Sequence, residues 1–366
     1  MGRKREPDDL SVHELIEGPT EILSRETLDA IRRPESADAD ANADADPSVE
    51  RTHDLSASAA EVTTDLSGSA ADVTTDLSAH GPAGTGGRER VELARMPAAG
   101  ALYRRAVLGA LPGVGRGRRG NDLPAVEFAV RGVRVDRAHL ADYDRVCGFR
   151  LTDRLPGTYP HILGFPLALR LMTTPGFPIA LTGVVHVGNR ITTHRPITAD
   201  EVLDFTTYAQ DLRPHDRGRQ VDVVLVGSVD GEEVWRGVST YLGRERTPGG
   251  RERGERPTPP TATARWRVEP RVGTEYARVS GDHNPIHTSR LGARLFGFRQ
   301  PIAHGMWSKA RCVAALETRL PDAYTVEVAF KLPVPLPSTV NFALLPDNGF
   351  ALHDSGGRPH LAGVVR

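Results

Sequence analysis

The chain has 366 residues, which is enough for two or three domains with cores of ordinary size. Lys and Arg number 46 and Asp and Glu number 47, so the formal net charge of -1 gives no global argument for a nucleic-acid-binding or membrane-surface protein. Two cysteines, Cys147 and Cys312, cannot build a disulfide framework and have no paired zinc spacing. No apolar run approaches the ~18 residues of a membrane helix, and the N-terminus turns acidic where a signal peptide would be apolar. We therefore expect a cytoplasmic protein.

Charge is divided unevenly along the chain. Residues 1–90 carry 9 basic and 20 acidic side chains, whereas the remainder carries 37 basic and 27 acidic ones. Residues 34–87 are of low complexity, and a repeat of 11 residues starts at Asp54, Asp65 and Asp76. Each full repeat offers one leucine and one valine for burial, so we expect disorder rather than the supercoil that this period can indicate. The basic remainder suits a substrate that carries phosphate groups.

The first globular stretch predicts strands and one buried helix. Residues 126–136 alternate like a strand, and the apolar middle of residues 155–178 predicts a buried helix that begins near Pro160. Alternating β-branched residues follow, with predicted turns over residues 211–218 and at Asp230-Gly231, the latter a hairpin signal. A helix followed by antiparallel strands indicates an α+β layout.

The same order of elements then occurs again. A linker rich in proline, glycine and charge is followed by a strand at residues 264–268, a helical stretch and further strands to Arg366. This repetition predicts two related halves. The predicted divisions are a tail (1–90), an N-terminal half (91–246), a linker (247–263) and a C-terminal half (264–366).

The chemically informative window runs from Tyr276 to Trp307. Ser280-Gly281-Asp282 places a carboxylate in a turn, and His287 follows five positions after the aspartate, beyond Asn284-Pro285. Both side chains could therefore enter one cavity. A carboxylate and an imidazole held together form an acid/base pair that works near neutral pH.

A second helix is predicted to open at His304-Gly305. Its N-terminus would present free backbone N–H groups, and Gly305 has no Cβ to block the approach of a thioester carbonyl, so its N–H could stabilise an oxyanion. Acid, base and oxyanion donor are the groups needed to add or remove water across a double bond beside a carbonyl. A metal held by Asp282, His287 and His304 is an alternative use of the same residue types. The chemistry needs no metal, however, and no further ligand cluster occurs in the sequence.

The window resembles the MaoC-like, type-2 (R)-specific enoyl-CoA hydratases. The family signature is an aromatic residue, then S-G-D-x-N-P-x-H, with P-I-x-H-G about fifteen residues later. Here it is matched by Tyr276, by residues 280–287 and by Pro301 to Gly305. Residues 330–334 also resemble the family's F-x-x-P-V strand, although Leu-Pro-Ser replaces the usual glycine-acid turn that follows.

The resemblance covers about residues 91–366 and implies a double hotdog, in which each of two repeats is a central helix wrapped by an antiparallel sheet. It makes Asp282 and His287 the catalytic pair and Gly305 the oxyanion donor. The other motif residues would position the site or bind substrate, and they are Asn284, His304, Ser280, Gly281 and Pro301. In the N-terminal half, residues 158–161 begin the central helix without an upstream D-x-N-P-x-H, which resembles the degenerate repeat that shapes the acyl tunnel.

The predicted activity is reversible hydration of a trans-2-enoyl thioester of CoA or acyl-carrier protein to the (3R)-3-hydroxyacyl thioester. The alternatives are a hotdog thioesterase, which usually places a lone carboxylate on its central helix, and a non-catalytic acyl-CoA-binding protein. No cofactor, metal, nucleic acid or membrane insertion is expected, and the choice between monomer and homodimer stays open. We expect His161, His186, His194 and Cys312 to be structural and His283 to be a spectator.

Overall fold

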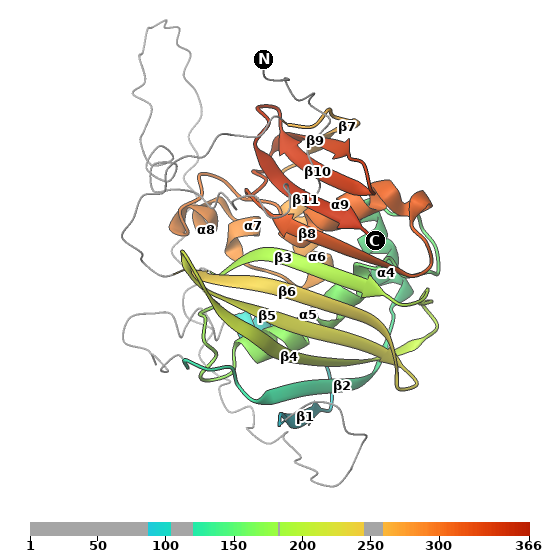
Figure 1. Cartoon of the computed structure of the whole chain (residues 1–366), viewed down its shortest axis with the longest axis vertical. Coiled ribbons are helices and arrows are strands. Elements are labelled where there is room, and N and C mark those ends of the chain that lie inside the picture. The colour runs from blue at the N-terminus through green and yellow to red at the C-terminus, as the bar shows by residue number, and fades with distance from the viewer. Residues whose placement is uncertain (1–86, 104–119, 182–183, 245–258) are drawn as a thin grey trace, which may run out of the picture. The chain divides into compact units, whose positions relative to one another are not determined.

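The structure is a computed structural model that describes residues 87–103, 120–181, 184–244 and 259–366 (Figure 1). The low-complexity tail before residue 87 and most of the predicted linker lie outside the described residues. Within the described part, no helix is long and apolar enough to cross a membrane.

The strands of the described chain form a single sheet. Its order is β1-β2-β4-β5-β6-β3-β8-β11-β10-β9-β7, and every neighbouring pair is antiparallel except β1 with β2. The strands are β1 (Glu89–Leu93), β2 (Val126–Arg134), β3 (Val184–Thr193), β4 (Val202–His215), β5 (Gly218–Val229), β6 (Glu232–Arg244), β7 (Ala264–Val268), β8 (Tyr324–Phe330), β9 (Ser338–Leu344), β10 (Gly349–Asp354) and β11 (Pro359–Val365). The helices that carry the site and its supports are α4 (Arg137–Cys147), α5 (Tyr159–Met172), α6 (Val272–Ser280), α7 (Pro285–Thr288), α8 (Arg290–Leu295) and α9 (Gly305–Leu316).

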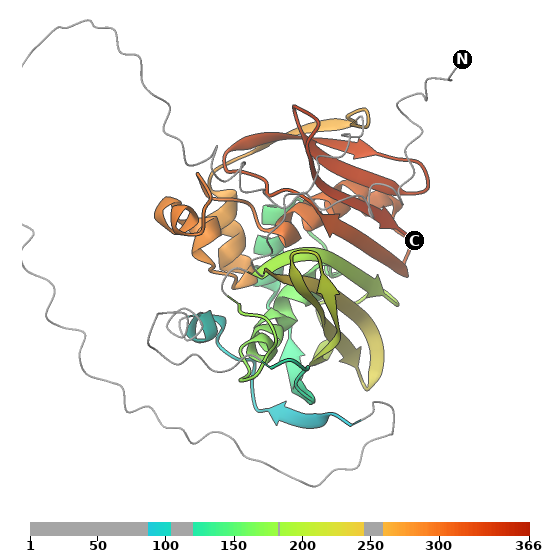
Figure 2. The ribbon, with the colours of Figure 1, turned by 60° about the vertical axis from the view of Figure 1, so that its left-hand side comes forward.

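One strand pattern occurs twice in this sheet. From β2 the order is β2-β4-β5-β6-β3, and from β7 it is β7-β9-β10-β11-β8, so in each half the first strand lies beside the third and the second lies at the opposite end. The halves join through their second strands, where Thr193 of β3 pairs with Tyr324 of β8. Figure 2 shows the two halves in green to yellow and in orange to red. With α5 and α9 as the central helices, this repetition confirms the predicted double hotdog.

The local predictions for the N-terminal half hold with one correction. Strand β2, helix α5 and the hairpin at Asp230-Gly231 lie where the sequence predicts, and both turn residues have positive φ, which aspartate tolerates and glycine adopts freely. The turn predicted over residues 211–218 is wrong in extent, because β4 continues to His215. Asp211 instead has a φ of 53° at a bulge in the pairing of β4 with β5.

A buried lysine ties the halves together. Lys309 of α9 has no exposed surface, and its ammonium donates to Asn189 Oδ1 at 2.6 Å, to the Asn189 carbonyl at 3.2 Å and to the Val326 carbonyl at 3.0 Å. Burial lowers the pKa of Lys309 well below its ordinary value. Since the acceptors come from β3 and β8, this side chain fixes the central helix of one half to the junction of both.

Candidate active site

The local sequence explains how the acid/base residues are presented. Helix α6 ends at Gly281, which has a φ of 71°, a left-handed conformation that suits glycine, so the chain turns sharply before Asp282. The side chain of Asn284 then accepts a hydrogen bond from the Ile286 N–H at 3.3 Å and caps α7. This short helix carries His287 back toward the aspartate.

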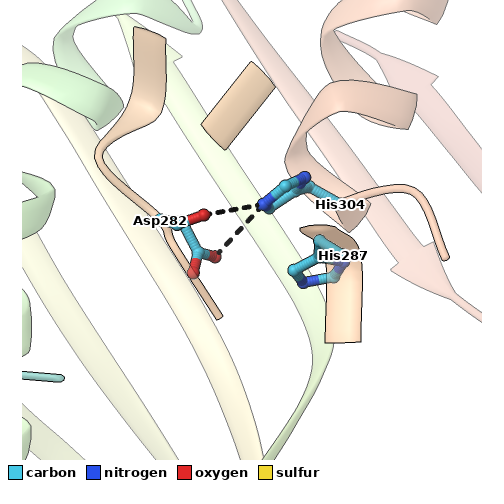
Figure 3. Close-up of side chains that lie close together, drawn as sticks. All are labelled: Asp282, His287 and His304. Atoms are coloured by element: carbon cyan, nitrogen blue, oxygen red, sulfur yellow. Dashed lines mark hydrogen bonds and ion pairs between the residues drawn. The ribbon is translucent and has the colours of Figure 1, made fainter. Parts of the chain in front are cut away.

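The three ionisable side chains of the motif converge (Figure 3). Ligand-type atoms of Asp282, His287 and His304 lie within 4.8 Å of one another. The imidazoles of His287 and His304 are stacked, with centroids 3.7 Å apart and 26° between their planes. His304 Nε2 lies 3.0 Å from the backbone oxygen of Asp282 and 3.9 Å from its Oδ2. The structure therefore brings the predicted pair and His304 into one cluster.

Hydrogen bonds to backbone carbonyls show which ring nitrogen carries the hydrogen in His287 and in His304. His287 Nδ1 lies 2.8 Å from the Ile302 oxygen, and because a carbonyl only accepts, Nδ1 donates and Nε2 keeps the lone pair. By the same argument His304 Nε2 donates to the Asp282 carbonyl. Burial lowers the pKa of His287, and burial together with the neighbouring His287 lowers that of His304 to about 3. Both imidazoles are therefore neutral near pH 7, and His287 offers Nε2 as the base.

The two oxygens of Asp282 differ in their surroundings. Oδ1 accepts from the Tyr103 hydroxyl at 2.5 Å and from the Asn284 N–H at 3.2 Å, whereas Oδ2 faces His304. Burial raises the pKa of Asp282, but the adjacent imidazoles of His304 and His287 and these hydrogen bonds outweigh burial, so the pKa is lowered. The carboxylate is thus ionised near neutral pH, and Oδ2 is the oxygen available to a substrate.

Sequence reasoning missed Tyr103. This tyrosine lies 179 positions before Asp282 in the chain, outside the motif, and no local pattern marks it. It lines the same cavity as the aspartate. Burial and the adjacent carboxylate of Asp282 raise the pKa of Tyr103, so its hydroxyl remains a donor at any working pH.

The cluster opens into a cavity of about 310 Å³ that both halves line. From α5 it receives Ile162, Phe165, Leu169 and Met172, and from the C-terminal half Phe330 and the motif region. His161 and His186, predicted to be structural, also line it, and burial lowers their pKa values to about 4 and about 3. They are therefore neutral walls of the cavity. Of the other residues predicted to have no catalytic role, Cys312 is buried, His283 is exposed, and His194 pairs with Glu233.

The remaining predicted site residues divide into two groups. Gly305 begins α9 and lines the cavity, and the N–H of a first helical residue has no partner within its helix. Ser280 also lines the cavity. Gly281 and Pro301 are not among the lining residues. Gly281 caps α6, and the Pro301 carbonyl accepts from the Leu336 N–H at 2.8 Å, so both shape the backbone around the site.

The described residues of the N-terminal half do not include the equivalent groups. Helices α4 and α6 both end in a left-handed glycine, Gly148 and Gly281, but the following residue is Phe149 in one half and Asp282 in the other. An isolated β-bridge precedes each central helix, formed by Arg154 with Thr198 in one half and by Ile302 with Pro335 in the other. Two residues after the bridge, the N-terminal half has Pro156 where the C-terminal half has His304. The alignment of the halves therefore leaves a single complete acid/base set in the described chain.

The same three side chains are the residues of the described chain that could hold a metal ion, because their carboxylate and ring-nitrogen atoms lie within 4.8 Å of one another. Each histidine donates its other ring nitrogen to a backbone carbonyl, which is also common for histidines that bind metals. The acid/base chemistry of the pair needs no ion.

Known proteins are similar to this chain in sequence and in fold. The model of the MaoC like domain matches residues 251–348. The 3-hydroxyacyl-thioester dehydratase X of Mycobacterium tuberculosis is 39% identical over 270 residues, which cover 72% of this chain and 95% of that protein. The crystal structure of HtdX from that organism, at 38% identity, has a TM-score of 0.59 and covers 66% of this chain and 99% of its own. A MaoC-like dehydratase from Phytophthora capsici, at 18% identity, has a TM-score of 0.54 over 69% of this chain and 98% of its own, which supports the fold alone.

Proposed function

Because the chain belongs to the MaoC-like dehydratase family, we propose that it hydrates trans-2-enoyl thioesters to (3R)-3-hydroxyacyl thioesters and catalyses the reverse dehydration. The observation that carries this proposal is the convergence of Asp282, neutral His287 and the N-terminus of α9 on one cavity. The name of the Mycobacterium tuberculosis relative supports a thioester of a 3-hydroxyacyl group as the substrate class.

The pair completes a balanced proton cycle. In hydration, the pair takes a proton from water as the oxygen bonds to C3. Because Asp282 is ionised and His287 Nε2 carries a lone pair at the start, this same proton is then given to C2 of the substrate. One proton is taken and one is given, so the pair returns to its starting state and no redox cofactor or metal enters the balance. Asp282 Oδ2 and His287 Nε2 are the two atoms free to act, because Asp282 Oδ1 and His287 Nδ1 already have partners.

The start of α9 serves the thioester carbonyl. Addition of water across the double bond passes through an enolate-like state in which negative charge develops on this oxygen. The N–H of Gly305 and the positive end of the helix dipole stabilise that charge. Phe330 packs against this glycine, since a Cβ there would lie 3.2 Å from its ring. We infer that Phe330 limits how close the carbonyl can approach.

The acyl chain occupies the part of the cavity lined by α5. Phe165, Leu169 and Met172 provide an apolar wall, which suits an alkyl chain and gives no group for chemistry. In this arrangement the N-terminal half selects the chain and the C-terminal half reacts with it. CoA or an acyl-carrier protein holds the thioester at the mouth of the cavity.

One assay separates this function from its alternatives. Hydration of crotonyl-CoA lowers the absorbance of the conjugated double bond without release of CoA. A thioesterase would release free CoA, and a binding protein would change neither signal while still binding the substrate. We expect loss of absorbance with no free thiol. Free CoA appearing at the rate of absorbance loss would contradict the proposal.

A further inference from the structure

Helix α8 packs its small residues inward and exposes its large apolar ones. Gly292 and Ala293 are buried, and a Cβ on Gly292 would lie 2.5 Å from the Pro285 side chain, so only glycine lets α8 approach α7 so closely. Leu291 and Leu295 are 71% and 78% exposed. An amphipathic helix that serves a core has the opposite arrangement, with its leucines buried. The leucines of α8 therefore have no role in the core of the described chain.

Arginines flank these leucines in the sequence and form no ion pair with another described residue. Arg290, Arg294 and Arg299 are all exposed, and none forms an ion pair within the described ranges. The sequence contains no aspartate or glutamate between Asp282 and Glu317. We call Arg290, Leu291, Arg294, Leu295, Phe296 and Arg299 the α8 patch. The patch thus combines exposed apolar side chains with positive charge.

The patch adjoins the reacting end of the cavity. Phe296 is 43% exposed and also lines the cavity, and Phe298 lines it as well, so the C-terminal end of α8 forms part of the rim. His287 on α7 lies only three positions before α8 begins. Figures 1 and 2 both show α8 on the outside of the molecule beside α7. A carrier that delivers a thioester to this mouth would therefore stand over the patch.

We propose that the α8 patch docks an acidic carrier protein that presents the acyl group as a thioester on its prosthetic arm. The inference rests on the proposed function and specifies the carrier of its substrate. Small molecules such as CoA bind in concave sites, whereas exposed leucines flanked by arginines have the composition of a protein interface. The exposed arginines are complementary to acidic side chains and raise the rate of association.

The test compares two carriers of the same acyl group. Hydration of crotonyl-CoA and of crotonyl-acyl-carrier protein is measured with the full chain and with two variants, Arg290→Ser/Arg294→Ser/Arg299→Ser and Leu291→Ser/Leu295→Ser. We expect each variant to lower kcat/KM for the protein-borne substrate by about tenfold or more and to change that for crotonyl-CoA less than about twofold. The control is Leu151→Ser/Arg265→Ser, which removes a leucine and an arginine that are exposed elsewhere and should affect neither substrate.

Binding is also measured without turnover, so that a failure of the docking proposal can be distinguished from a failure of the proposed function. Isothermal titration of the unacylated acyl-carrier protein into the full chain should give a dissociation constant that is higher for the arginine variant and that rises with added salt. Equal loss of kcat/KM for both substrates, unchanged titration of the arginine variant, or an equal effect of the control would overturn the proposal. Patch-dependent sedimentation with anionic phospholipid vesicles, without binding of the carrier protein, would assign the patch to a lipid surface instead.

Discussion

The hydroxyl of Tyr103 donates a hydrogen bond of 2.5 Å to Oδ1 of Asp282, from a segment 179 residues earlier in the chain. The bond engages one carboxylate oxygen and leaves the other facing His304. A donor to the ionised form favours that form, so Tyr103 both orients the carboxylate and helps to keep it charged. We regard Tyr103 as a positioning residue, because it acts through Asp282.

Replacing this tyrosine should shift the acidic limb of the pH profile of kcat/KM. In Tyr103→Phe the pKa of Asp282 should rise, since a donor to the carboxylate is lost, and the acidic limb of kcat/KM against pH should move upward by about one pH unit. Plateau turnover should fall less than it does when the aspartate itself is changed. Tyr241→Phe is the control, because Tyr241 lines the cavity and is not hydrogen-bonded to Asp282. Coincident acidic limbs for wild type and Tyr103→Phe would remove the positioning role.

His161 should be dispensable for chemistry. It lines the cavity from α5, and burial lowers its pKa to about 4, with Lys309 nearby favouring the neutral form. We expect His161→Ala to retain kcat within about tenfold while its preference among acyl chain lengths changes, because a wall of the cavity is enlarged. The measurement is kcat and KM across a series of enoyl-CoA chain lengths. A loss of kcat as large as that of His287→Ala would show that the N-terminal half supplies a catalytic group.

A methyl group on Gly305 should lower turnover. In Gly305→Ala the new carbon would lie 3.2 Å from the Phe330 ring and would intrude where the thioester carbonyl approaches, so kcat should fall by about 10²–10³. Gly305→Ala/Phe330→Leu tests the cause, because it relieves the contact within the protein. The melting temperature should recover in the double variant, while kcat should stay low. Recovery of kcat would mean that the contact with Phe330, rather than the approach of the thioester oxygen, explains why a glycine is needed at position 305.

The chemical window could be predicted from sequence because it is local. Asp282, Asn284, His287 and Gly305 lie within a span of 24 residues, and turn-forming glycine and proline dictate how the chain folds back within it. Tyr103 could not be found in this way, because its contact with the site is created by tertiary packing alone.

The predictions of the fold divide in the same way, between features that local sequence specifies and features that tertiary pairing creates. The positive φ values at Asp230-Gly231 come from a turn that two residues specify, and the structure has the hairpin there. Asp211 is likewise an aspartate with a positive φ, but it lies at a bulge inside a long strand, because the pairing of β4 with β5 continues past it. The buried Lys309 was not foreseen either, since its acceptors on β3 and β8 meet only when the halves join.

A buried carboxyl outside the site makes stability depend on pH. Asp144 of α4 is 1% exposed, and neither carboxyl oxygen has a hydrogen-bond partner within the described part of the chain. Burial, and secondarily Glu317, raises its pKa from 3.8 to about 7. The folded state thus binds the proton more tightly than the unfolded state, so this group's contribution to stability falls as pH rises from about 4 to about 7 and stays low above that.

Asp144→Asn should therefore stabilise the protein most in alkaline solution. Compared with wild type, the melting temperature of the variant should be higher at pH 8, and this advantage should shrink or reverse at pH 5. Asp142→Asn is the matched control on the same helix, where the half-buried carboxylate pairs with Arg145 at 2.5 Å. Thermal unfolding at the two pH values is the measurement. A difference between variant and wild type that does not change with pH would contradict the buried-acid account.

The double-mutant cycle of Asp282→Asn and His287→Ala tests the central claim, that these two side chains act together as the acid/base pair. Each single variant should lower kcat for crotonyl-CoA hydration by about 10²–10⁴, while KM changes far less, because binding depends on the carrier and the acyl wall. If the two side chains act as one unit on this shared proton, as the mechanism requires, the double variant should be little worse than the more impaired single variant. Each protein must be folded, as judged by its melting curve. Effects that add fully in the double variant, or turnover near wild type in folded Asp282→Asn, would contradict the mechanism.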